Sequence, residues 1–201
     1  MRRFAVRPII PILALVALSA QAADMLLIDD FKDNDGLSAL GTAWRLVTDR
    51  VMGGVSAGRM SREELDGRRA LCMRGDVSLD NNGGFIQLNL ELKSPGYLDA
   101  SGYTGILVVV RGNGASYNLH LKTADVRLPW QSYRCSFQTG PEWREIRLPF
   151  QSFEPHRIGM PLDTVRLDRL GLVAIGRAFT AEICVAQVGF YRERPDSKSA
   201  Q

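Results

Sequence analysis

The sequence has few residues of the kinds that hold metal ions or cross-link a small fold. It contains two histidines and three cysteines in 201 residues, and no Cys-x-x-Cys pair. Because zinc sites need several such ligands at short spacings, the sequence predicts no metal site built from them. The wide spacing of Cys72, Cys135 and Cys184 is not that of a disulfide framework, although one bridge is compatible with it and all three pairings stay open. Cys135 alternates with Tyr133 and Phe137, which favours a small buried hydrophobic side chain.

Neither sign of charge is in excess beyond the first residues. Three of the 25 basic residues lie in residues 1–22, which contain no acidic residue, so the rest of the chain carries 22 basic and 22 acidic groups. A nucleic-acid-binding protein needs a dense basic surface to displace the counterions of phosphates. The balanced charge therefore argues against a nucleic-acid partner.

Long apolar runs are missing except near the N-terminus. There, a basic start with Arg2, Arg3 and Arg7 precedes an apolar run over residues 9–20 and small residues at positions 20 and 22. This pattern predicts a signal peptide over residues 1–22 and export to the periplasm or the medium. The run is about a dozen residues long, short of the ~20 that a membrane-spanning helix needs, so we do not expect an integral membrane protein.

Helical periodicity is also lacking, and a period of two takes its place. Over residues 85–92, four aliphatic side chains alternate with Gln87, Asn89 and Glu91, and residues 117–122 alternate in the same way. Such alternation is typical of strands with one wet face. The β-branched run 106–110 is apolar on both faces, which predicts a strand covered on both sides. Further strands are predicted at 44–48, 69–74, 132–138, 143–148 and 180–191, with one helical turn at 61–65.

Turn residues separate these strands at short intervals. Asn81-Asn82-Gly83-Gly84 contains the Asn-Gly pair of tight hairpins, and Gly112-Asn113-Gly114 is interpreted in the same way. Many short strands with regular turns indicate an all-β sandwich or jelly roll. We expect one such domain over residues 23–192 and a polar, frayed tail over residues 193–201.

Two catalytic motifs are matched without the context that they require. Gly54-Val55-Ser56-Ala57-Gly58 fits the G-x-S-x-G nucleophile elbow, but no alternation of strands and helices follows it, and nothing brings His120 or His156 to Ser56. Gly112-x-Gly114 lacks the third glycine of a dinucleotide-binding loop, because Tyr117 stands there. The sequence therefore predicts no enzyme and no organic cofactor.

An acidic run over residues 29–36 offers several oxygen ligands. It does not fit the calcium-binding helix-loop-helix pattern, because Phe31 occupies the first ligand position. A solvated turn is the favoured interpretation, and a structural calcium ion is the alternative.

Several motifs together resemble one family. They are Trp44-Arg45-Leu46-Val47-Thr48-Asp49-Arg50-Val51-Met52-Gly53-Gly54-Val55-Ser56, then Asn82-Gly83-Gly84-Phe85, then Arg111-Gly112-Asn113-Gly114-x-x-Tyr117, and finally Trp143 with Leu148-Pro149-Phe150-x-x-Phe153. In this order they resemble the NADH:ubiquinone oxidoreductase (complex I) intermediate-associated protein 30 family over nearly all of the expected domain. The resemblance implies a galactose-binding-like β-sandwich and a non-catalytic role in assembling complex I. The predicted export departs from that role, since the best-known members act in the mitochondrial matrix.

The shared motif predicts a cluster of loops at one end of the sandwich. Its candidate binding residues for a ligand or partner are Asp49, Arg50, Met52, Gly53, Gly54, Ser56, Asn82, Gly83, Gly84, Arg111 and Tyr117. Glycines permit tight turns, and the polar side chains supply an acceptor, a planar donor and a hydroxyl. The alternative is that Asp and Ser simply hold their own turns in place.

Two kinds of partner fit this fold. One is a protein held by the motif loops, which an exposed apolar patch around Met52 would favour. The other is a carbohydrate, which needs an aromatic platform beside polar groups. An exposed Trp130 near the polar strand faces would favour a sugar. The candidate aromatic residues are Trp130, Tyr133 and Tyr103, and the candidate polar residues are Gln87, Asn89, Asn118 and His120.

Overall fold

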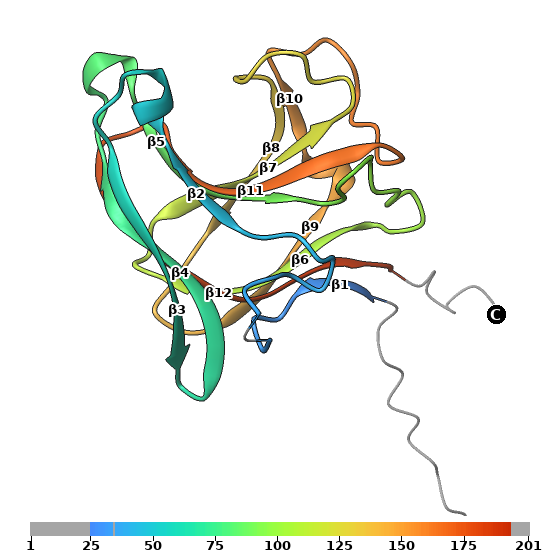
Figure 1. Ribbon diagram of the computed structural model, residues 1–201, viewed down its shortest axis with the longest axis horizontal. Helices are drawn as coiled ribbons and strands as arrows, with labels where there is room; N and C mark the ends of the chain where they lie inside the picture. Colours follow the sequence, from blue (N-terminus) through green and yellow to red (C-terminus); the bar gives the residue numbers. More distant parts are fainter. Residues whose placement is uncertain (1–24, 34, 194–201) are drawn as a thin grey trace, which may run out of the picture.

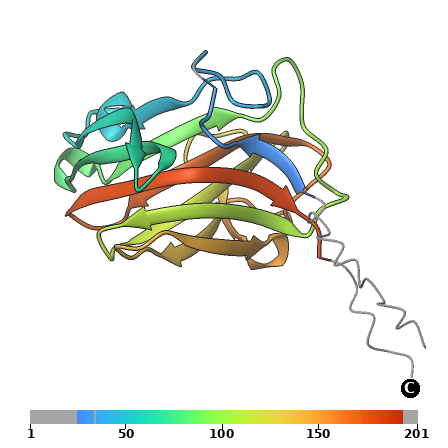
Figure 2. The ribbon, with the colours of Figure 1, turned by 90° about the horizontal axis from the view of Figure 1, so that it is seen from below.

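The computed structural model describes residues 25–33 and 35–193, which form a sandwich of two antiparallel sheets (Figure 1). The first, the β12 sheet, has the order β3-β4-β12-β6-β9, with β1 paired to β12. Its strands are β1 (Met25–Asp29), β3 (Ala57–Leu65), β4 (Arg68–Val77), β6 (Gly105–Gly112), β9 (Arg144–Pro149) and β12 (Phe179–Tyr191). Figure 2 shows the long β12 beside β6 and β1.

The second, the β11 sheet, has the order β10-β8-β7-β11-β5-β2. Its strands are β2 (Arg45–Thr48), β5 (Phe85–Glu91), β7 (Ser116–Thr123), β8 (Ser132–Gln138), β10 (Glu154–His156) and β11 (Leu167–Ile175). Three short 3₁₀ turns complete the elements: η1 (Asp49–Met52), η2 (Asp80–Asn82) and η3 (Phe150–Ser152). The predicted all-β jelly-roll sandwich is confirmed.

The core lies between the two sheets and follows the alternation seen in the sequence. Ile86, Leu88 and Leu90 of β5 are fully buried against side chains of the β12 sheet, while the residues between them face away from the core. Strand β6 is buried on both faces, as its sequence predicts. Leu107 and Val109 belong to a second, smaller apolar cluster on the outer face of the β12 sheet.

A disulfide joins two neighbouring strands of the β12 sheet. Cys72 of β4 and Cys184 of β12 stand directly opposite each other, with their Cα atoms 4.0 Å apart. The structure thus selects one of the three pairings that the sequence left open. Cys135 is a free, buried cysteine of the core, as expected, and burial raises the pKa of its thiol.

Some local predictions are wrong. Residues 61–65 do not form a helical turn but belong to β3, whose side chains are mostly exposed. Residues 81–84 and 112–114 do not close hairpins, because each joins a strand of the β12 sheet to a strand of the β11 sheet. Their turn chemistry is nevertheless as expected, since Asn81, Asn82 and Gly84 have positive φ angles.

The predicted signal peptide, residues 1–22, and residues 194–201 of the predicted tail lie outside the described residues. Within the part of the chain that the structure covers, no helix is long and apolar enough to cross a membrane.

Candidate ligand-binding cleft

The shared motif is organised around one buried carboxylate. Asp49 is fully buried, and its side chain accepts hydrogen bonds from the backbone N–H groups of Ser56 (2.9 Å), Gly84 (2.6 Å) and Phe85 (3.3 Å), and from the Ser56 hydroxyl. These donors come from the turn after η1 and from the turn that enters β5. Through these hydrogen bonds, Asp49 links its own loop to the turn at Gly84, which lies more than thirty residues further along the chain.

The glycines of the motif make room for this carboxylate. A Cβ atom on Gly54 or Gly83 would collide with the Asp49 carboxyl group. Gly53 ends η1 with a φ angle of 89°, a left-handed conformation that glycine adopts without strain. These three positions shape the loops rather than contact a ligand through a side chain.

The hydrogen bonds to Asp49 also determine its ionisation. Burial acts to raise the pKa of Asp49, but the hydrogen bonds from Ser56, Gly84 and Phe85 outweigh it and hold the pKa below its usual value. Asp49 is therefore ionised at neutral pH. The Ser56 hydroxyl is buried between Asp49 and the backbone of Ser78, so it is not exposed at a nucleophile elbow.

Apolar side chains cover the outer side of the motif. Val51 and Met52 of η1 are 72% and 54% exposed, and Val55 and Leu79 are also exposed. We call these four residues the apolar tip. Because the Asp49 hydrogen bonds hold η1 beside η2, the tip is one raised corner of the molecule (Figure 1). Arg50 and Asn82 lie on the same corner and are exposed.

Two of the predicted site residues lie away from this cluster. Arg111 forms an ion pair with Asp66, and its guanidinium lies over the Trp143 ring on the outer face of the β12 sheet. Tyr117 is fully buried in the core, donates to Asn113 Oδ1 (3.0 Å) and accepts from the backbone N–H of Glu182 (2.8 Å). The expectation that Arg111 approaches the motif loops is therefore wrong.

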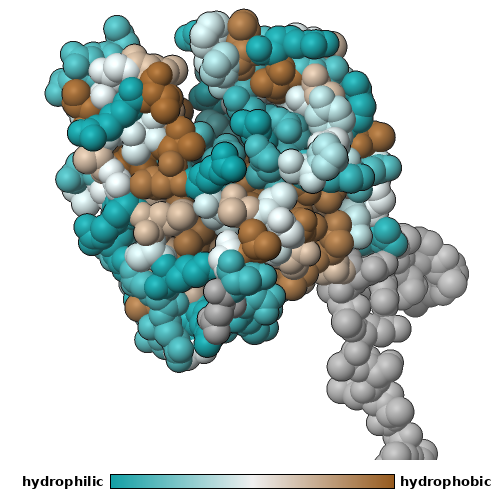
Figure 3. All heavy atoms as spheres, viewed as in Figure 1, coloured by the Kyte–Doolittle hydropathy of each residue, from teal (hydrophilic) through white to brown (hydrophobic). Residues whose placement is uncertain are grey.

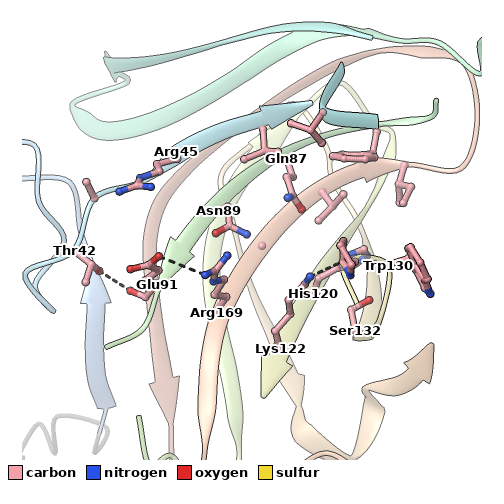
Figure 4. Close-up of a pocket in the computed structure, with 18 of the residues that line it drawn as sticks. Thr42, Arg45, Gln87, Asn89, Glu91, His120, Lys122, Trp130, Ser132 and Arg169 are labelled. Atoms are coloured by element: carbon pink, nitrogen blue, oxygen red, sulfur yellow. Dashed lines mark hydrogen bonds and ion pairs between the residues drawn. The ribbon is translucent and has the colours of Figure 1, made fainter. Parts of the chain in front are cut away.

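A wide hollow lies on the face of the β11 sheet that points away from the core. Its cavity volume is about 960 Å³, and Figure 3 shows it as a gap between two raised parts of the surface. The floor is made by side chains that alternate with the core residues of β2, β5, β7, β8 and β11 (Figure 4). The polar and charged floor residues are Arg45, Gln87, Asn89, Glu91, His120, Lys122, Ser132, Arg134 and Arg169.

Two loops form walls of this cleft. Val51 and Met52 line it from η1, so part of the apolar tip faces the cleft. Pro129 and Trp130 line it from the connection between β7 and β8, and the Trp130 side chain is 48% exposed. The buried network of Asp49 therefore holds one wall of the cleft in place.

The residues predicted for a sugar site are partly brought together. Gln87, Asn89, His120 and Trp130 all line the cleft. Asn118 lies on β7 but does not line the cavity, and its Oδ1 accepts from Ser136 (2.9 Å). The two tyrosines are not available as platforms. Tyr133 is buried and donates to the Pro161 carbonyl (3.0 Å), and Tyr103 packs against the Phe190 ring.

His120 is neutral and incompletely bonded. Burial, followed by the charge of Arg134, lowers the pKa of its imidazole to about 3. Its Nε2 atom is buried and has no hydrogen-bond partner among residues 25–33 and 35–193. A buried polar atom without a partner is uncommon in folded proteins, and it lies here at the floor of the cleft.

The basic residues of the cleft were not predicted. Arg45, Lys122, Arg134 and Arg169 line it together with a single carboxylate, that of Glu91. Each of these side chains is at an outward position of a strand. The alternation that predicts the strands therefore also predicts that these side chains face away from the core. Their shared charge becomes visible only when the sheet brings outward residues of β2, β7, β8 and β11 to one surface.

The acidic run at residues 29–36 behaves as a turn where it is described. Asp29 is buried and accepts from the backbone N–H of Phe31 (2.8 Å) and from the Trp44 indole (2.9 Å), while Asp35 accepts from the backbone of Leu37 (2.9 Å). No group of three or more His, Cys, Asp or Glu side chains that could hold a metal occurs among the described residues. A structural calcium ion stays the untested alternative to the solvated turn.

The family model of complex I intermediate-associated protein 30 matches residues 30–183. The chain belongs to this family. The match includes the Asp49 network, both loops that it joins, and the strands of the cleft floor. No curated protein matches the sequence.

Solved structures with the same fold include carbohydrate-binding modules and an agarase. The family 11 module of the cellulase Lic26A-Cel5E of Clostridium thermocellum has a TM-score of 0.68 and 14% identity, over 86% of this chain and 96% of that one. The same family's module in complex with a β-1,3-1,4-mixed-linked tetrasaccharide has a TM-score of 0.66 and 14% identity, over 85% and 97%. An agarase has a TM-score of 0.57 and 10% identity, over 85% of this chain and 25% of that one. At these identities the likeness shows the fold alone.

Proposed function

We propose that this protein is an exported, non-catalytic module that binds a carbohydrate in the cleft of the β11 sheet. The observation that carries the proposal is the arrangement of the cleft. A concave floor of hydrogen-bonding side chains lies beside a half-exposed tryptophan, within a cavity of about 960 Å³. A cavity of this size accommodates several sugar rings or one drug-sized molecule.

The chemistry of the floor suits sugar hydroxyl groups. The amides of Gln87 and Asn89 each offer donors and an acceptor, and neutral His120 adds an imidazole whose Nε2 has no partner in the described structure. The exposed face of Trp130 offers an apolar surface for the C–H face of a sugar ring. A related fold binds a mixed-linked tetrasaccharide in one of the similar structures, which supports this class of ligand.

Export is supported by two independent features. The N-terminal sequence has the pattern of a signal peptide. The disulfide between Cys72 and Cys184 is of a kind that persists in oxidising compartments and is rare in the cytosol. An exported protein would be separated from the cytoplasmic arm of complex I, so we infer that carbohydrate binding, rather than complex I assembly, is the function of this family member.

Calorimetric titration of the mature protein with a panel of neutral and acidic oligosaccharides tests the proposal. We expect at least one oligosaccharide to bind, and Trp130→Ala to weaken that binding about tenfold, since buried aromatic anchors carry much of a binding energy. Tyr97→Ala is the matched control, because Tyr97 is a similarly exposed aromatic residue that does not line the cleft. Absence of binding across the panel, or equal losses in both variants, would contradict a sugar site at the cleft.

A protein partner is a second candidate, because the apolar tip is exposed. Val51, Met52, Val55 and Leu79 form an apolar corner of the kind found at protein interfaces. The double variant Val51→Ser/Met52→Ser should then fail to capture, in a cross-linking experiment, a partner that the wild-type protein captures. Unchanged capture would exclude the tip as the interface.

A further inference from the structure

The charged residues of the cleft are unequally divided between the two signs. Four cationic side chains line it, Arg45, Lys122, Arg134 and Arg169, against the single carboxylate of Glu91. The chain beyond residue 22 carries equal numbers of basic and acidic residues. The excess of positive charge is therefore a local property of the cleft.

The one carboxylate of the cleft already has a partner. Glu91 lies 3.6 Å from the guanidinium of Arg169, which also pairs with Asp168 at 3.3 Å. Among the described residues, no carboxylate forms an ion pair with Arg45, Lys122 or Arg134. No ion pair therefore neutralises these three side chains, although Glu154 of β10 stands opposite Arg134 in the sheet and Asp168 lies near enough to Lys122 to act on its charge.

Two of these cations lie on adjacent strands beside Trp130. Arg134 of β8 stands opposite His120 of β7, so Lys122 occupies the diagonal position on the same face. Lys122 donates to the Pro129 carbonyl (2.7 Å), which places its ammonium next to the Trp130 loop (Figure 4). Arg134 donates through Nε to the Ser132 hydroxyl (2.9 Å). That bond uses one of its five donor N–H groups and holds the guanidinium over the floor.

Like charges on one face of a sheet repel each other, most strongly when they stand directly opposite and less at the diagonal position that Arg134 and Lys122 occupy. The surroundings add to this cost, because burial and the nearby Arg157 lower the pKa of Arg134, and burial followed by Arg169 lowers that of Lys122, with Asp168 acting in the opposite direction. An anion bound between the two side chains would remove the repulsion. A pair of cations held in place beside an aromatic ring therefore has the form of an anion subsite.

We propose that the carbohydrate is acidic, an inference that rests on the proposed function. Arg134 and Lys122 bind a carboxylate or sulfate group of the sugar chain, while Trp130 contacts the ring. Arginine suits this role because its planar donors match two oxygens of a carboxylate or sulfate. Gln87, Asn89 and His120 would then bind the hydroxyl groups of the same or the next residue.

The test compares oligosaccharides that differ only in charge. Tetragalacturonate and its methyl ester present the same sugar with and without carboxylates, and a sulfated cellotetraose distinguishes sulfate from carboxylate as the source of charge. We expect the acidic sugar to bind at least tenfold more tightly than the neutral one, since hydrogen bonds to charged groups are the strong ones. Its affinity should fall as salt rises from about 50 to about 500 mM, because screening weakens exposed charge pairs.

Charge-removing variants locate the subsite. Arg134→Gln and Lys122→Gln should each weaken binding of the acidic sugar about tenfold while leaving binding of the methyl ester within about twofold. Their melting temperatures should stay within about 2 °C of the parent, since the repulsion that is removed offsets the lost hydrogen bonds to the Pro129 carbonyl and the Ser132 hydroxyl. A purely structural role would lower them further. Arg144→Gln removes the same charge from β9 of the opposite sheet and is the control.

The outcomes separate this inference from the function on which it rests. Equal affinity for tetragalacturonate and its methyl ester would overturn the acidic ligand and leave carbohydrate binding standing. A lack of binding to every sugar, or equally tight binding of a pentaglutamate peptide, would overturn both. Salt-dependent binding that Arg134→Gln and Lys122→Gln leave unchanged would overturn the assigned subsite.

Discussion

Replacing Asp49 by asparagine is the sharpest test of what the family motif does. The carboxylate accepts four hydrogen bonds, one at Oδ1 and three at Oδ2. In the Asp49→Asn variant the amide oxygen can take the position of Oδ2, but the NH₂ group then faces the backbone N–H of Ser56 and that bond is lost. The other three bonds lose the assistance of charge, and each is worth about 1 kcal/mol less.

These losses are partly offset because a buried charge no longer has to be desolvated. The net destabilisation is therefore about 3 kcal/mol, which for a domain of this size lowers the melting temperature by roughly 6–12 °C. Differential scanning calorimetry of Asp49→Asn, with Asp80→Asn as an exposed control on the neighbouring η2, measures the difference. A melting temperature within about 2 °C of the parent, together with lost ligand binding, would refute a structural role for Asp49.

Three further predictions concern stability. Reduction of Cys72–Cys184 should lower the unfolding free energy by about 4–5 kcal/mol in a denaturant titration, because the bridge closes a loop of 112 residues in the unfolded chain. Gly75→Ala should lower the unfolding free energy by about 2 kcal/mol in the same assay, since its Cβ would lie 2.6 Å from the Cα of Gly58 on the paired strand. A glycine with no atom near the position of a Cβ would tolerate alanine. The pKa of Asp49 is lowered from 3.8 by folding, so its contribution is complete above about pH 4 and is lost as the pH falls through the lower value. Unfolding curves from about pH 6 to about pH 2 should show this loss in the parent but not in Asp49→Asn.

The strands were predictable wherever one face is wet and the other is buried. Residues 85–91 and 116–123 alternate almost perfectly, and both are inner strands of the β11 sheet. Residues 167–175 were missed, although they lie at the centre of that sheet. The reason is that Val173 and Ile175 face the cleft as apolar residues, which hides the period of two.

Turn chemistry was predictable, but the destination of the chain after each turn was not. The positive φ angles around residue 82 follow from Asn and Gly, whereas the choice between the same sheet and the opposite one depends on packing far from the turn. Similarly, residues 61–65 contain helix-favouring glutamates, but pairing with β4 determines their conformation.

The candidate site was predictable in part, because the alternation along the strands also shows which side chains face outward. The sequence named Gln87, Asn89, His120 and Trp130 among seven candidates for a sugar site, together with Asn118, Tyr103 and Tyr133. Alternation placed the polar candidates on outward strand faces, whereas no local pattern showed that Trp130 is exposed. The sequence could not show that Ser56 donates hydrogen bonds to Asp49, since that requires knowing which loops are in contact. The basic character of the cleft emerges only when outward residues from five strands are viewed on one surface.

The Asp49 network has a consequence for how ligand preference can change in such a protein. The buried carboxylate, its glycines and its serine shape a wall of the cleft without contributing a side chain to the floor. The floor residues, in contrast, stand at outward strand positions where substitutions leave the core packing untouched. A duplicated copy could therefore acquire a new ligand by exchanging a few floor side chains while keeping the recognisable motif intact. Under the proposed function, the motif shapes a wall of the cleft, while ligand preference depends on the outward side chains of β5, β7, β8 and β11.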